Sequence, residues 1–178
     1  SLDMDRGLLV ETVVTRDDDA GTAGQMDGIY AWGTGDRLIA ATGSPNLSED
    51  LYNDLAQEIV EASGLTPDTA FVNGTLKRSI TNWGTSIRRI PDAKKIYTNS
   101  IGEYDGDFGT QRIVWDLHAT AGYLLLCRMS EVFVAFGGPI KSVEIGKTRD
   151  ARGGYVKTEL TLEVRNPNTV GVTTGLNG

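Results

Sequence analysis

The sequence EYDGDFGTQRIVW at residues 103–115 is followed by IGKTRD at 145–150 and ELTLEVRN at 159–166. Short apolar runs of this kind, separated by glycine-bearing turns, are typical of strands. From residue 160 to residue 164 apolar and polar side chains alternate, which predicts a strand with one buried face. We therefore expect residues 103–176 to form most of a sheet.

Two helices are predicted upstream of this region. Ser48 is a suitable N-cap for a helix over residues 48–62, in which apolar side chains recur every four residues, and Gly64 suits its end. A short apolar strand at 70–72 leads to a second helix near 74–83, with apolar side chains three and four positions apart. Helices followed by strands predict an α+β fold.

The N-terminal part of the sequence is less regular. Residues 1–15 carry a partial apolar stripe, which predicts one short helix. Residues 15–24 are polar and contain three consecutive aspartates and two glycines, which predicts a solvated loop. Over residues 28–46 we expect extended chain with turns.

The composition restricts the class of protein. The chain has 178 residues, of which 39% are hydrophobic and 23% charged, and both values suit a globular domain. Its net charge of −7 disfavours binding to phosphate backbones and anionic membranes, although an acidic wall is still able to enclose DNA. No apolar window approaches the roughly 20 residues that span a bilayer, and no signal peptide is visible.

Residues that carry catalytic chemistry are scarce. The sequence has one histidine, His118, and one cysteine, Cys127, so a metal site built from His and Cys lacks ligands. A Gly-x-Ser-x-Gly nucleophile motif is also missing. We expect His118 at a strand end, Cys127 buried as a small apolar residue, and neither a cofactor nor a catalytic or metal site.

Asp105 and Asp107 flank a glycine. Carboxylates at this spacing suit a hard cation or an acid–base pair, but they also suit a turn in which they cap backbone N–H groups or meet an arginine. Paired catalytic carboxylates usually come from different elements, so we interpret both as turn residues at a strand entrance. The alternative, a small hydrolase, requires both to face a cleft with a raised pKa.

The sequence contains one basic cluster, and no series of aromatic residues of the type that stacks on bases is interleaved with it. An intersubunit salt-bridge patch and a solvated loop are the two interpretations, and both are preferred to a nucleic-acid site. The cluster consists of Arg88, Arg89, Lys94 and Lys95.

The motifs quoted above, in this order, resemble the C-terminal part of the major capsid proteins of tailed phages, in particular the SU10-like group. That family has a Tyr-x-Thr-Asp-Phe-Gly element, then Leu-Ala-Lys-Thr-Gly-Asp, then a Glu-x-Thr-Leu-Glu-Val-Arg-Asn strand. Here Gly106 stands in place of the threonine, Ile145 and Gly146 in place of Leu-Ala, and Arg149 in place of the glycine. The likeness extends over about residues 26–176.

The resemblance implies the Hong Kong-97-type capsid fold, with an axial domain and a peripheral domain that contains a long spine helix. Residues 1–27 would be the end of that helix and a flexible loop. Residues 28–178 would be an axial-domain-like region whose C-terminal strands return to the peripheral domain. The N-terminal arm, the extended loop and most of the spine helix would lie upstream, so the chain is expected to be N-terminally truncated.

The function implied is that of a structural, non-enzymatic subunit of an icosahedral phage capsid, located in the virion and assembled in the host cytoplasm. Its partners would be copies of itself in capsomer rings, with portal, scaffold or decoration proteins; DNA would be enclosed without sequence-specific binding, and no membrane is involved. Glycine-rich loops at residues 17–36 and 146–154 would supply adaptable contacts. The residues expected at interfaces are Arg88, Arg89, Lys94, Lys95, Asp105, Asp107, Lys147, Arg149 and Asp150.

The main alternative is another phage structural module, such as a tail-tube or baseplate protein. Tail tubes also assemble as rings, but their core is a β-barrel without two adjacent helices. A helix content near zero would therefore favour this alternative.

Overall fold

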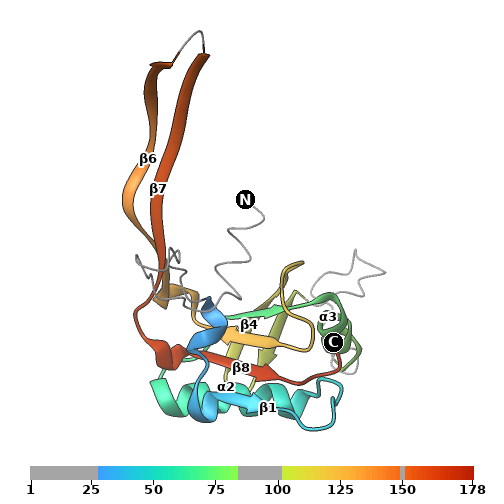
Figure 1. The fold of residues 1–178 in the computed structure, drawn as a ribbon. Helices are drawn as coiled ribbons and strands as arrows, with labels where there is room; N and C mark the ends of the chain where they lie inside the picture. The colour runs from blue at the N-terminus through green and yellow to red at the C-terminus, as the bar shows by residue number, and fades with distance from the viewer. Residues whose placement is uncertain (1–27, 84–101, 149–150) are drawn as a thin grey trace, which may run out of the picture.

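The computed structural model of the protein describes residues 28–83, 102–148 and 151–178. These residues form a body, made of a six-stranded sheet with two α-helices, and a separate two-stranded hairpin that extends from it (Figure 1). The predicted α+β class is confirmed. The predictions for residues 1–15 and 15–24, and for the basic cluster, lie outside the described residues.

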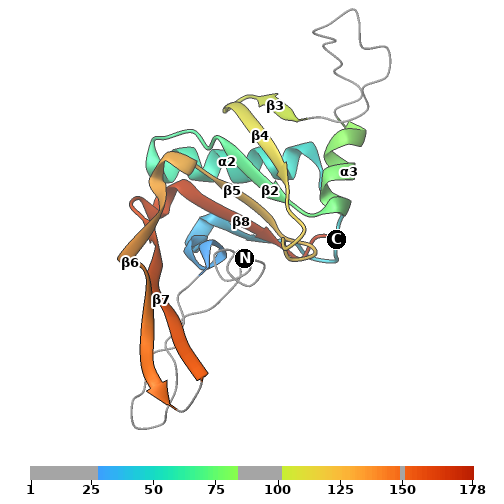
Figure 2. The same cartoon turned by 90° about the horizontal axis from the view of Figure 1, so that it is seen from above.

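The sheet joins strands that are far apart in the sequence (Figure 2). Two of its strand pairs are parallel, β1 with β8 and β2 with β4, and the other three pairs are antiparallel. The strand order is β1 (Leu38–Ala40), β8 (Val170–Thr174), β5 (Leu124–Cys127), β2 (Thr69–Val72), β4 (Gly109–Trp115) and β3 (Glu103–Gly106).

Helix α2 (Glu49–Ser63) confirms the prediction for residues 48–62. The Ser48 side-chain oxygen accepts a hydrogen bond from the Leu51 N–H at 3.3 Å, which satisfies one of the free donors of the first turn. Gly64 ends the helix in the left-handed conformation, with a φ of 69°, which costs glycine little.

Helix α3 (Gly74–Trp83) confirms the second predicted helix. Asn73 caps its first turn, because its side-chain oxygen accepts from the Leu76 N–H at 2.9 Å. Leu76 and Ile80, one helical turn apart, are buried against the sheet. None of the helices among the described residues is long and apolar enough to cross a membrane.

The sheet buries apolar side chains on both faces. On the face covered by α2 and α3, Leu124 and Leu126 of β5 belong to the same core as the buried side of α2. Leu125 and Cys127 alternate with them and lie in a second core on the other face. All four are fully buried, and β5 is apolar along its whole length because both of its faces are covered.

The second face of the sheet is covered by the segment before β1 and by the base of the hairpin. Ile29, in the short 3-10 helix η1 (Ile29–Trp32), packs in the second core with Val170 and Val172. A further 3-10 helix, η2 (Gly35–Arg37), follows directly. These two helical turns replace part of the extended chain that was predicted for residues 28–46.

A buried arginine explains this difference. Arg37 is only 9% exposed. Its guanidinium donates hydrogen bonds to the backbone carbonyls of Val170, at 2.9 Å, and of Pro167 and Trp32. Two of these acceptors come from segments about 130 residues away in the sequence, so the local pattern around Arg37 contains no signal for these turns.

Candidate assembly surface

A long hairpin projects from one end of the body (Figure 1). It consists of β6 (Val132–Thr148) and β7 (Ala151–Val164), which pair antiparallel along almost their whole length. The prediction of a glycine-rich loop at residues 146–154 was wrong, because Glu144 pairs with Gly154 and Thr148 with Ala151. All but residues 149 and 150 of that segment belong to the two strands.

One face of the hairpin base is apolar. Three successive cross-strand pairs lie on it, because directly opposed residues of antiparallel strands point to the same side. Val132, Val164 and Leu162 pack against the second core, whereas Phe136 is 62% exposed and Val134 is 42% exposed. The apolar surface therefore continues from the interior of the body onto the hairpin. The three pairs are Val132 with Val164, Val134 with Leu162, and Phe136 with Leu160.

The opposite face of the base is held by an arginine. The Arg165 guanidinium lies 4.0 Å from the centre of the Phe133 ring and 3.1 Å from a carboxylate oxygen of Glu163. The Arg165 backbone N–H also donates to the carbonyl of Glu131 at 2.9 Å. These contacts fix the point at which the hairpin leaves the body, while the Arg165 side chain remains 59% exposed.

The other end of the sheet also exposes apolar side chains. Trp115, at the end of β4, is 58% exposed, and Leu117, in the following turn, is 73% exposed. His118 lies in the same turn, three residues after β4, and its backbone N–H donates to the Asp116 carboxylate at 2.8 Å. This agrees with the position near a strand end predicted for His118.

Strands β3 and β4 form an edge hairpin that carries the two predicted aspartates. Asp107 lies in the turn, as predicted, but Asp105 is a strand residue opposite Thr110. The Thr110 hydroxyl donates to the Asp105 carboxylate at 3.1 Å. The prediction that both are turn residues was therefore wrong for Asp105, because Glu103–Gly106 pairs with β4 up to Gly109. Both aspartates are exposed on this edge hairpin.

Three aromatic rings connect the edge hairpin to the helices. The ring centre of Tyr52 is 5.1 Å from that of Tyr104, and Trp83 lies 5.7 Å from each. The Tyr104 hydroxyl donates to a carboxylate oxygen of Glu49 at 2.8 Å. Burial, with a smaller contribution from Glu49, raises the pKa of Tyr104 to about 12. The phenol therefore stays protonated at neutral pH and acts as a fixed hydrogen-bond donor.

Cys127 is buried in the second core, as predicted. Burial is the main cause that raises the pKa of its thiol to about 12, and Asp68 adds to the effect. A thiol with this pKa is almost entirely protonated at neutral pH and is a poor nucleophile. Among residues 28–83, 102–148 and 151–178, no group of three His, Cys, Asp or Glu side chains is arranged to hold a metal ion.

The structure brings few of the predicted interface residues together. Lys147 lies in β6, near the tip of the long hairpin. Asp105 and Asp107 belong to the separate edge hairpin of β3 and β4. The other predicted interface residues lie outside the described part of the chain. They are Arg88, Arg89, Lys94, Lys95, Arg149 and Asp150.

The architecture of the body is that of viral and encapsulin shell proteins. An encapsulin complex from Synechococcus elongatus aligns with a TM-score of 0.59 and 11% identity, over 85% of this chain and 57% of that chain. A structure from Gordonia phage Cozz has a TM-score of 0.55 and 11% identity, over 96% and 58%. The satellite phage P4 procapsid has a TM-score of 0.52 and 12% identity, over 98% and 59%. The chain thus spans less than two thirds of each of these chains.

The sequence itself assigns the family. The profile of the SU10 major capsid protein matches residues 1–177, so the chain belongs to the SU10 major capsid protein family. This confirms the predicted resemblance and the predicted capsid fold, and it argues against the tail-tube and baseplate alternative. No curated protein matches the chain.

The long hairpin is the part of the surface that sequence reasoning missed. Its strands appeared as separate short runs because Gly137, Gly138 and Pro139 interrupt β6. One signal was present: the alternating segment at 160–164 has its cross-strand partners at 132–136, another short apolar run. Two runs of similar pattern, separated by residues without a helical period, are compatible with a hairpin.

Proposed function

We propose that this chain is the greater part of a capsid subunit that assembles with copies of itself into closed rings, which build an icosahedral shell around the phage genome. The observation that carries the proposal is the match of residues 1–177 to the major capsid protein family. The exposed apolar side chains at both ends of the sheet support it, since a shell subunit needs contact surfaces on more than one side.

The same proposal assigns a role to each part of the molecule. The six-stranded body with α2 and α3 corresponds to the axial domain, and the strands β6 and β7 belong to the peripheral domain. Residues 1–27, which lie outside the described residues, are assigned by this proposal to the peripheral domain. Assembly takes place in the host cytoplasm, with portal, scaffold or decoration proteins as further partners.

We propose further that the protein is not an enzyme and holds DNA without reading its sequence. The carboxylates of Asp105 and Asp107 are exposed on an edge hairpin, and the thiol of Cys127 is buried with a raised pKa. A net charge of −7 keeps phosphate backbones from binding tightly to the protein as a whole.

The test is electron microscopy and sedimentation velocity of the complete gene product that carries this sequence, expressed alone. Closed shells or rings of uniform size are expected. A variant with Ile59→Asp, which places a charge in the fully buried core, is the negative control and should form neither. Monodisperse monomers at concentrations of tens of micromolar would contradict the proposal.

A further inference from the structure

The far end of the long hairpin carries a charge opposite to that of the rest of the chain. We define the distal hairpin as residues 139–148 and 151–158, beyond the irregularity in register that follows Gly138. It contains four basic residues and one acidic residue, which gives a net charge of +3. The whole chain carries −7, so the remaining residues carry −10. The charged residues of the distal hairpin are Lys141, Lys147, Arg152, Lys157 and Glu144.

Two of these lysines occupy directly opposed positions. Lys141 pairs with Lys157 in the register of β6 and β7, which places both residues on the same face. Like charges at opposed positions destabilise a strand pair. A carboxylate on another surface is a suitable partner for this pair of positive charges.

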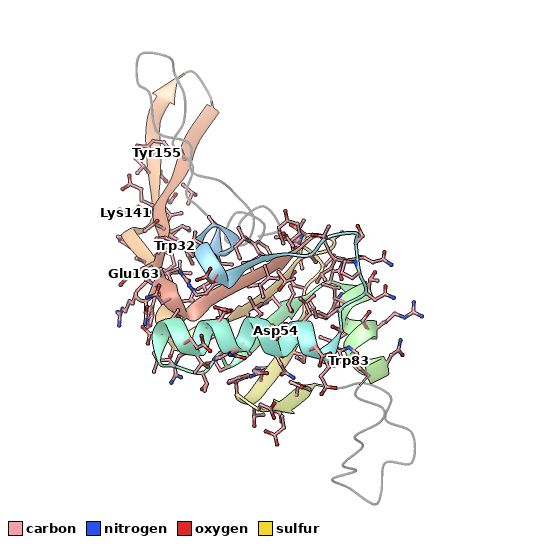
Figure 3. All side chains as sticks on the ribbon, turned by 90° about the horizontal axis from the view of Figure 1, so that it is seen from below. Trp32, Asp54, Trp83, Lys141, Tyr155 and Glu163 are labelled. Atoms are coloured by element: carbon pink, nitrogen blue, oxygen red, sulfur yellow. The ribbon has the colours of Figure 1, made fainter. Side chains whose placement is uncertain are left out.

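The distal hairpin also exposes apolar side chains beside its positive charge. Ile140 is 70% exposed and Val156 is 69% exposed, while Tyr155 is 51% exposed and stands opposite Val143. Figure 3 shows Lys141 and Tyr155 on the part of the hairpin that extends away from the body. An isolated two-stranded ribbon is marginally stable in water, and a tyrosine next to exposed aliphatic groups is typical of an interface.

We propose that the distal hairpin is a docking surface for a second copy of this chain, and that it binds the acidic outer side of helix α2 of that copy. This inference rests on the proposed function, because assembly supplies the second copy. The chain contributes a basic, partly apolar projection and a strongly acidic remainder. Two copies therefore provide both halves of a complementary contact.

Helix α2 fits the role of acceptor. Asp50, Asp54 and Glu58 follow one another at intervals of four residues, so they lie on one side of the helix. Asp50 and Asp54 are exposed, and residues 49–63 contain no lysine or arginine. In Figure 3 Asp54 lies on α2, well separated from Lys141 and Tyr155.

The contact joins two different surfaces of the same molecule. A contact of this kind is heterologous, and repeated around an axis it closes into a ring. Opposite charges on the two surfaces accelerate association and disfavour a hairpin-to-hairpin contact. In such a ring, the distal hairpin of each subunit binds helix α2 of the next subunit, always in the same sense around the axis.

DNA is the other polyanion that a basic hairpin is able to contact. The second copy is favoured because the distal hairpin has Glu144 among its few charges and exposes apolar side chains, which phosphates do not match. The net charge of −10 outside the hairpin also repels DNA from the same molecule.

The test uses the complete gene product with Lys141→Glu and Lys157→Glu together, at an ionic strength of about 0.1 M, where the Debye length is about 10 Å. We expect the concentration at which half of the subunits are assembled to rise about tenfold or more, as measured by sedimentation velocity. Circular dichroism and thermal unfolding of the unassembled variant should match those of the wild type diluted below its own assembly concentration, which shows that the body is folded. Tyr155→Ala should weaken assembly without changing its salt dependence.

Two further variants make the result specific. The matched control is Arg78→Glu with Arg112→Glu, which makes the same change in charge on exposed residues of α3 and β4; it should assemble as the wild type does. Asp54→Lys with Glu58→Lys, added to the hairpin variant, should restore assembly. Equal losses in the control, or no restoration by the α2 variant, would overturn the inference.

The outcomes separate this inference from the proposed function. If the wild type forms no rings or shells, the proposed function fails. If the wild type assembles and the hairpin variant assembles equally well, only the inference fails. Loss of binding to a DNA duplex in the hairpin variant, with assembly unchanged, would show that the hairpin contacts DNA and would also overturn the inference.

Discussion

The body and the long hairpin differ in how far the rest of the chain covers their strands. In the body, β5 has neighbouring strands on both edges and covered faces on both sides, and all four of its residues are fully buried. In the hairpin, β6 and β7 pair only with each other within the described part of the chain, and most of their described side chains are exposed. The body is therefore stabilised from within the chain, whereas the hairpin has surface left for stabilisation by another molecule.

This contrast shows that strand length is a poor guide to stability. Strand β6 has 17 residues and β5 has four, yet the shorter strand has the larger buried apolar surface per residue. Burial of apolar area, at about 25 cal/mol per Å², rather than the number of ladder hydrogen bonds, sets the contribution of each strand.

The largest effect is expected from Leu126→Ala in the body. Leu126 is completely buried, and its replacement leaves a cavity that should lower the free energy of unfolding by about 2–5 kcal/mol. Ile140→Ala, at a 70% exposed position of the hairpin, should change it by less than about 0.5 kcal/mol. Urea unfolding followed by circular dichroism measures both. Similar losses would mean that the hairpin is packed as tightly as the body.

Two glycines, one in the body and one in the hairpin, should differ in how well they tolerate a side chain. Gly122 has a φ of +75°, and a Cβ there would lie 2.5 Å from the carbonyl oxygen of Leu176. Gly122→Ala should therefore cost about 1–3 kcal/mol. A Cβ added at Gly138, in the hairpin, would meet no atom within 4 Å, so Gly138→Ala should be tolerated within about 0.5 kcal/mol. Thermal unfolding of the two variants provides the comparison, and a larger shift for Gly138 would reverse it.

The buried thiol of Cys127 makes the free energy of unfolding of the body depend on pH. Its pKa is raised from 9.0 to about 12 by burial, so the unfolded chain loses this proton at lower pH than the folded chain does. The resulting stability is fully present below pH 9.0 and is lost as the pH rises towards 12. The loss should reach about 1.4 kcal/mol by pH 10.

Urea unfolding at pH 8 and pH 10 measures this loss, with Cys127→Ala as the control. The control lacks the ionisable thiol, but it keeps every other group that titrates at high pH, including Tyr104. Its stability should therefore fall less between the two pH values. Parallel behaviour of the two proteins would show that the folded state does not protect Cys127.

The smallest effect is expected at the base of the hairpin, from Glu163→Gln. The ion pair between Glu163 and Arg165 has an N–O distance of 3.1 Å, but both side chains are about half exposed. Water and salt screen such a pair, so its removal should cost less than about 0.5 kcal/mol. Arg165 keeps its position over the Phe133 ring. A loss above about 1 kcal/mol in a urea titration would show that the base of the hairpin is a stable part of the body.

The elements that the sequence predicts well are those whose signals are local. Helix α2 has its cap, its apolar stripe and its terminating glycine within 17 residues, from Ser48 to Gly64. The alternation at 160–164 is visible because that part of β7 rests on the second core. In both segments one side of the element faces the interior, and the pattern of side chains records it.

The remaining features depend on contacts that a local pattern does not contain. The distal hairpin has solvent on both faces, so no alternation is required, and Gly153 and Gly154 resemble a loop even though they are paired in β7. Asp105 belongs to a strand because of its pairing with Thr110. The family was predicted from the order of motifs, but the docking surface depends on charges that become adjacent only through the register, such as Lys141 opposite Lys157.

The position of β8 has a consequence for the order of events during synthesis. β8 is the last of the strands to leave the ribosome, yet it lies between β1 and β5 in the sheet and also receives the buried Arg37 from a segment 133 residues earlier. Until it is inserted, β1 has no neighbour and the apolar face of β5 is open. Contacts this distant in sequence form slowly. Nascent chains thus pass through a state with an open sheet edge, in which premature association leads to misassembly. Insertion of β8 between β1 and β5 completes the sheet, so a subunit becomes ready for assembly only after this step.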